Sequence, residues 1–143
     1  MRLIETIKPR PAKKTGSRHQ QDDGSFWQPL GGRTICDMFQ HWGATEVYVV
    51  PRGQEGGRCV LGCYAIKFPD GWAYAHHSDQ SCYASRERYD APNGRTAWLA
   101  IELNSTRESL RYAREKLAKA EAEADAMMSE YCAELAKAMK GAL

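Results

Sequence analysis

Two adjacent histidines and a nearby cysteine are the residues in this chain best suited to chemistry. His76, His77 and Cys82 lie in the stretch FPDGWAYAHHSDQSCYAS, residues 68–85. A cysteine becomes a nucleophile near neutral pH when a neighbouring imidazole takes its proton. Cys82 with His76 or His77 therefore gives one hypothesis, a cysteine-dependent enzyme. No glycine-rich oxyanion turn surrounds Cys82, and nothing marks out an Asn or Asp that would orient the histidine.

A zinc site is the second chemistry that these residue types suggest. If the segments 58–68 and 72–77 pair so that facing residue numbers add to 140, Cys63 lies opposite His77 and shares a face with Cys59. Residues four apart on a strand are separated by about 13 Å, whereas ligands of one zinc ion need sulfurs about 4 Å apart. His76 and His77 point to opposite faces of the strand. We therefore expect no metal and no cofactor, and we interpret Cys59 and Cys63 as small core residues.

Other enzyme motifs are absent from the chain. The glycine-rich stretch at residues 31–34 lacks the length and the lysine of a P-loop, and neither GxGxxG nor HExxH occurs. The adjacent carboxylates Asp22 and Asp23 lie in a polar segment where nothing would position them. We predict that the protein is not an enzyme.

Arginine and tyrosine gather in residues 78–95, a segment longer than an ordinary connection. A rigid aromatic ring beside a guanidinium is typical of binding hot spots, because it offers area and directed hydrogen bonds at a low entropy cost. Such residues can also stack on single-stranded bases or hold phosphates. The alternative is a solvated, disordered connection. The candidate partner-binding residues are Tyr83, Arg86, Arg88, Tyr89 and Arg95.

Basic residues concentrate at the N-terminus. Residues 1–21 carry six Lys or Arg and one acidic residue, although the net charge of the chain is only +2. Prolines, glycines and the lack of an apolar period predict a flexible basic arm over residues 1–24. The alternation of apolar and polar residues favours a short edge strand at residues 3–7. The candidate nucleic-acid-binding residues, for the alternative function, are Lys8, Arg10, Lys13, Lys14 and Arg18.

The centre of the chain alternates between helix and strand signals. Apolar spacing predicts a short amphipathic helix over residues 34–42, followed by strands at residues 46–50, 58–68, 72–77 and 96–103. Pro69, Asp70 and Gly71 join two of these strands in a hairpin. The uninterrupted apolar run at 96–103 is typical of a strand buried on both faces. We expect an α+β fold with an antiparallel sheet of about four strands.

The last third of the chain is predicted to form one long helix. Residues 105–108, Ser-Thr-Arg-Glu, match a capping box, and no proline or glycine follows before Lys140. A narrow apolar stripe runs along about 50 Å of helix, whereas a strand of six to eight residues spans only some 20 to 26 Å. Part of the helix therefore needs a partner, and we expect an antiparallel helix pair in a homodimer. The candidate dimerisation residues are Met127, Met128, Tyr131 and Leu135.

Chain length and cysteine content indicate the domain organisation and the cellular compartment of the protein. The 143 residues fit one domain with appendages: the arm 1–24, an α+β core over residues 25–104 and the helix 105–143, packing on the sheet and extending to a partner. Five cysteines without a framework, and an N-terminus without an apolar h-region, predict reduced thiols and a cytoplasmic protein. No apolar run is long enough to span a bilayer.

These observations favour a non-enzymatic interaction protein that binds and modulates a larger protein or nucleoprotein complex. Small, motif-poor chains of this kind occur among phage and mobile-element proteins that inhibit or modulate host machinery, which is an analogy at the level of a class. Nucleic-acid binding through the arm and the Arg/Tyr segment is one alternative, and the cysteine-dependent enzyme is another. Nucleic-acid affinity would fall steeply with salt, whereas a packed protein interface would depend on salt much less.

Overall fold

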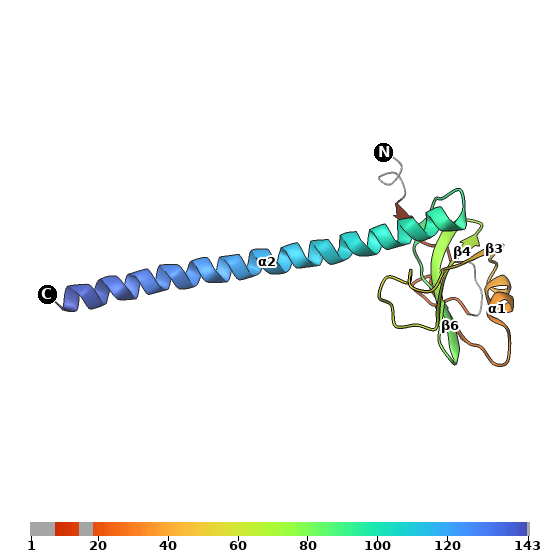
Figure 1. Ribbon diagram of the computed structural model, residues 1–143, viewed down its shortest axis with the longest axis horizontal. Helices are drawn as coiled ribbons and strands as arrows, with labels where there is room; N and C mark the ends of the chain where they lie inside the picture. Colours follow the sequence, from red (N-terminus) through yellow and green to blue (C-terminus); the bar gives the residue numbers. More distant parts are fainter. Residues whose placement is uncertain (1–7, 15–18, 143) are drawn as a thin grey trace. The chain divides into compact units, whose positions relative to one another are not determined.

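The computed structural model describes residues 8–14 and 19–142 and confirms the α+β class (Figure 1). The described residues form seven strands, where the sequence predicts about four, and two helices. The elements are β1 (Pro9–Arg10), β2 (Phe26–Pro29), α1 (Ile35–His41), β3 (Glu46–Val49), β4 (Gly62–Phe68), β5 (Gly71–His77), β6 (Ser81–Ala84), β7 (Arg88–Tyr89) and α2 (Gly94–Gly141). The chain divides into two compact units, Met1–Ser105 and Thr106–Leu143. The predicted edge strand at residues 3–7 lies outside the described residues.

The sheet is antiparallel, with the strand order β1-β7-β5-β4-β3 and with β6 pairing both β5 and β2. In the β4–β5 hairpin, Phe68 faces Gly71 and Cys63 faces His76, so facing numbers add to 139 and the predicted register is wrong by one residue. The turn consists of Pro69 and Asp70 alone, and Gly71 already belongs to β5. A side chain on Gly71 would come within 3.0 Å of the Tyr89 carbonyl oxygen, and its φ of 138° favours glycine.

Helix α1, which the apolar spacing predicts, covers one face of the sheet. The Thr34 hydroxyl caps the helix by accepting from the Asp37 amide at 3.1 Å. Met38, Phe39 and Trp42 are buried. They pack against a cluster that contains Phe26, Tyr64, Ile66, Phe68, Ala73, Ala75, Cys82 and Ala84.

The opposite face of the sheet is covered by the first turns of α2, so the strand predicted at residues 96–103 is wrong. The Asn93 side chain accepts from the Thr96 amide at 2.9 Å and from its hydroxyl at 3.0 Å, and so begins the helix. Ala97, Trp98 and Ile101 are buried at helical spacing, whereas Leu99 is 52% exposed. A short apolar run fits a buried strand and a helix equally well, and the cap at Asn93 decides between them.

Two further local predictions need correction. The helix passes through residues 105–108 without a break, so the capping box does not start it. Strand β4 begins at Gly62, and Cys59 is exposed rather than a core residue. Because β4 starts after residues 58–61, those residues form part of a loop and Cys59 has no place in the sheet. Cys63 is buried, as expected.

The segment predicted as a flexible arm contributes to the sheet at two places. Pro9–Arg10 pairs antiparallel with Arg88–Tyr89. Gln20 forms an isolated bridge with Phe26. The flexibility of residues 1–24 and the start of the core near residue 25 stay predictions.

Replacement of Asn93 by alanine removes the cap that begins α2. We expect Asn93→Ala to lower the free energy of unfolding by about 1 kcal/mol, because the Thr96 amide loses its acceptor. Urea denaturation followed by circular dichroism measures the change. Asn93→Asp keeps an acceptor and should retain most of the stability, and equal losses in both variants would contradict a capping role.

Candidate functional site

Strand pairing assembles a row of side chains from four strands. Cys63 on β4 faces His76 on β5, His76 faces Tyr83 on β6, and Tyr83 faces Trp27 on β2. Directly facing residues of antiparallel strands project to the same side of a sheet. Trp27 is 48% exposed, His76 and Tyr83 are half-buried, and Cys63 is buried. We call Trp27, Tyr83 and His76 the aromatic row.

Contacts within the sheet hold the row in place. The rings of His76 and Tyr83 lie 5.0 Å apart. The Nδ1 atom of His76 lies 3.0 Å from the Tyr74 hydroxyl, which in turn lies 3.9 Å from the Cys63 sulfur. Burial, followed by repulsion from His77 and Arg58, lowers the pKa of His76, and burial raises the pKa of Tyr83. Both shifts favour the uncharged form, so the row is a neutral aromatic surface near pH 7.

Charges of both signs lie around the row, with carboxylates in excess. Arg86 pairs with Glu87 at 3.5 Å, and Glu87 and Asp23 both act electrostatically on Tyr83. Hydrogen bonds from the Ser25 hydroxyl and amide lower the pKa of Asp23 and keep it ionised. A surface hollow of about 360 Å³ adjoins this end of the sheet and is lined by Trp27, Pro29, Ser78, Asp79, Gln80 and Ser81.

Arg88, one of the predicted partner-binding residues, is part of the core. Its side chain is only 2% exposed, and its Nε donates to Asp70 Oδ1 at 3.0 Å. The Nη1 atom donates to the carbonyl oxygens of Ser85 at 2.7 Å and Glu87 at 3.1 Å. The guanidinium also lies 4.3 Å from the Phe68 ring centroid. Arg88 therefore ties β7 to the β4–β5 turn and offers little to a partner.

The other predicted partner-binding residues are spread over the fold. Tyr89 is buried, and its hydroxyl accepts from the Asn104 amide group at 3.2 Å. Arg95 is exposed near the start of α2, where it donates to the Gln54 side chain at 3.3 Å. Tyr83 belongs to the aromatic row, and the exposed Arg86 acts electrostatically on it. The structure thus brings together two of the five residues, Tyr83 and Arg86.

The cysteine-dependent hypothesis gains no support from the geometry around Cys82. Cys82 is fully buried in the cluster on the α1 face, and burial raises its pKa to about 11. Its register partner is His77, whose Nδ1 lies 2.8 Å from the Tyr64 hydroxyl. His76 lies on the other face, as the sequence predicts. A thiol that must form a thiolate near pH 7 needs a shift in the opposite direction.

The candidate nucleic-acid-binding residues have different environments. Lys8, Lys13 and Lys14 are exposed. Arg10 donates to Asp90 at 2.6 Å and to the Asp70 carbonyl oxygen, so its guanidinium is already paired within the fold. Arg18 lies outside the described residues.

Helix α2 carries a second candidate surface, in the unit Thr106–Leu143. Every described residue from 105 to 142 is exposed. The four predicted dimerisation residues are among them, with Met127 70%, Met128 61%, Tyr131 61% and Leu135 44% exposed. A helix face with this many exposed large apolar side chains is typical of a surface that packs against a partner.

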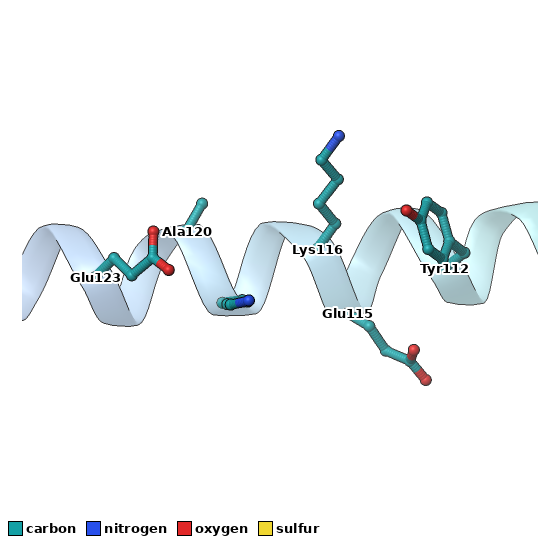
Figure 2. A pocket seen from close by; sticks show the side chains of 6 residues that line it. Tyr112, Glu115, Lys116, Ala120 and Glu123 are labelled. Carbon is teal, nitrogen blue, oxygen red and sulfur yellow. The ribbon is translucent and has the colours of Figure 1, made fainter.

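A hollow along α2 has no opposite wall. It is lined by Tyr112, Glu115, Lys116, Lys119, Ala120 and Glu123, all residues of this one helix. In Figure 2, Lys116 and Ala120 project on the same side of the ribbon and Glu115 on the other. Side chains of a single helix cannot enclose a small molecule, so this hollow is not a ligand pocket.

Sequence reasoning missed two important residues of the first unit. Trp27 follows the buried Phe26 in β2, and the alternation of buried and exposed residues in a strand is the signal that could have identified its position. Arg58 pairs with Glu102 on α2 and lies 4.8 Å from the ring centroid of Tyr74 and 5.1 Å from that of Trp98. No local pattern reveals this contact, because its partners lie far along the chain.

Removal of the Arg88 guanidinium should destabilise the fold strongly. We expect Arg88→Met to lower the free energy of unfolding by about 3 kcal/mol, because Asp70 and two carbonyl oxygens lose a buried donor. The exposed Arg86→Met is the matched control and should change stability by less than about 0.5 kcal/mol. Similar urea midpoints for the two variants would show that Arg88 has no structural role.

Thiol labelling should separate the cysteines into two classes. At pH 7 in the native protein, a thiol reagent should modify Cys36, Cys59 and Cys132, which are exposed. Cys63 and Cys82 should react only after denaturation, because they are buried and their pKa values are raised. Peptide mass spectrometry identifies the labelled sites, and rapid native labelling of Cys82 would instead support the cysteine-dependent enzyme.

No protein-family model matches the chain, and neither curated proteins nor solved structures give a significant match. Among the described residues, no group of three or more His, Cys, Asp or Glu side chains could hold a metal ion. No helix within the described part of the chain is long and apolar enough to cross a membrane.

Proposed function

We propose that this chain is a cytosolic, non-enzymatic interaction protein that binds and modulates a larger protein through the aromatic row and Arg86. The observation that carries the proposal is the register of β5, β6 and β2, which lines up His76, Tyr83 and the exposed Trp27. The analogy with small phage and mobile-element proteins suggests a component of host machinery as the partner.

The residue types of the row suit a protein interface. Tryptophan, tyrosine and arginine are the commonest hot-spot residues, because each offers a large contact area together with a polar group. Contacts with Tyr74 and within the sheet already restrict the rings of His76 and Tyr83. Binding then costs less side-chain entropy than it would for residues on a mobile loop.

The charges near the row favour a protein over a nucleic acid. Glu87 and Asp23 act on Tyr83, and Asp79 lines the hollow beside Trp27. The second guanidinium near the row, that of Arg58, is paired with Glu102. The three carboxylates therefore outnumber Arg86 and would repel phosphates, whereas platforms for single-stranded nucleic acid combine aromatic rings with a basic groove. We therefore expect a partner surface with an apolar centre and basic groups at its rim.

The test is capture of partners from a lysate of the source cell by the intact protein, followed by affinity measurement with the purified partner. Trp27→Ala should weaken binding by about 30-fold, as expected for a hot-spot residue worth about 2 kcal/mol. Val49→Ala is the matched control. Val49 is also an exposed apolar residue, at 62%, but it lies on β3, which does not pair with β2.

Three results would contradict the proposal. Equal effects of Trp27→Ala and Val49→Ala would exclude the aromatic row as the binding surface. If nuclease treatment removes the partner, or if the affinity falls steeply with salt, the results would support nucleic-acid binding instead. Unchanged binding in Arg86→Ala together with unchanged binding in Trp27→Ala would exclude the whole surface.

A further inference from the structure

Helix α2 exposes one continuous apolar face after residue 105. At about 100° per residue, steps of three and four keep successive side chains on one side of a helix. Its members are Leu110, Ala113, Leu117, Ala120, Ala124, Met128, Tyr131, Leu135 and Met139, and all are exposed. We call this face the apolar stripe.

Charge is distributed along α2 in blocks. Residues 107–119 contain five Lys or Arg and two Glu, whereas residues 120–134 contain five acidic and no basic residues. The basic block and the acidic block are of nearly equal length. A helix with this pattern is complementary to a second copy that runs in the opposite direction, because each basic block then meets an acidic one.

We infer that the occupant of the apolar stripe is a second copy of this chain, paired antiparallel over residues 107–134. In the register that aligns the blocks, facing residue numbers add to 241. Leu110 then faces Tyr131, Ala113 faces Met128, and Leu117 faces Ala124. Two of these three layers oppose a small to a large side chain, which lets the helices approach closely and interdigitate.

The charges beside the stripe agree with the same arrangement. At about 100° per residue, Arg114 and Asp125 lie on one flank of the stripe, and Lys116 and Glu123 lie on the other. In the register where facing numbers add to 241, Asp125 of the partner subunit lies two positions from the residue directly opposite Arg114. Glu123 of the partner subunit has the same offset from Lys116, and long side chains span it. Each contact occurs twice in a symmetric dimer.

A parallel pair of the same helices would be disfavoured. In parallel alignment the basic blocks face each other and the acidic blocks face each other, so every flank carries repulsion. A parallel pair would also stack Ala113 on Ala113 and Tyr131 on Tyr131, which leaves gaps beside crowded layers. Orientation is therefore determined by both charge and side-chain size.

This inference goes beyond the proposed function, because it concerns a different surface and a different partner. The two tests are separate: partner capture depends on Trp27 on β2, whereas self-association depends on the charges of α2. Either proposal can fail while the other stands.

The test is sedimentation equilibrium of the full-length chain over about 1 to 100 µM. The native protein should dimerise. Arg114→Glu with Lys116→Glu should weaken the dimer at least about tenfold, because acidic groups then face acidic groups, and Glu123→Lys with Asp125→Lys should do the same. The four substitutions in one chain should restore the dimer, since the paired flank charges have exchanged signs.

The matched control reverses two charges away from the stripe. Glu115→Lys with Lys119→Glu keeps the net charge and should leave self-association unchanged. Far-ultraviolet circular dichroism checks that every variant keeps its helix content. A monomer at all concentrations would overturn the inference, and so would failure of the fourfold variant to restore the dimer.

Cross-linking tests orientation with the native charges in place. In a background of Cys36→Ser, Cys59→Ser and Cys132→Ser, we mix chains that carry Ala113→Cys with chains that carry Met128→Cys. Mild oxidation should join the two kinds of chain to each other. Disulfides that form instead between two Ala113→Cys chains, or between two Met128→Cys chains, would show a parallel pair and overturn the inference.

Discussion

The buried guanidinium of Arg88 is the contact on which the arrangement of the first unit depends. It joins the carboxylate of Asp70 to the carbonyl oxygens of Ser85 and Glu87, and it covers the ring of Phe68. Desolvation lowers the pKa of Arg88, and the charge of Asp70 opposes that shift. A buried cation is tolerated only when its donors are satisfied, so the turn and β7 are held in one relation to each other.

Further elements follow from that contact. Arg10 reaches the carbonyl oxygen of Asp70 as well as Asp90, and β1 therefore pairs with β7. Gly71 permits the close approach of the Tyr89 backbone to the hairpin. With β5 fixed between β4 and β7, its second half remains free to pair with β6, and β6 pairs with β2. The aromatic row is a consequence of this branched sheet.

The two proposed surfaces would support each other. A dimer formed through α2 carries two aromatic rows, and a partner with two matching sites would be bound with an avidity above the affinity of a single row. The two surfaces also carry different charge patterns: a mixed-charge rim surrounds the aromatic row, and complementary blocks lie along α2. Charge pattern provides specificity more than raw affinity, so each surface should bind a different partner.

The sequence by itself determined the features that depend on local spacing. Helix α1, the position of the β4–β5 turn, the opposite orientation of His76 and His77, the α+β class and the extended helical character after residue 105 all follow from periods of two or 3.6 and from turn residues. Only the tertiary structure decided the rest. Residues 96–103 form helix because Asn93 caps them and the sheet buries Trp98, and local apolar content does not distinguish that outcome from a strand. Arg88 and Tyr89 lie in the core rather than on a surface loop, and Trp27 joins Tyr83, because long-range pairing decides which side chains are covered and which are adjacent.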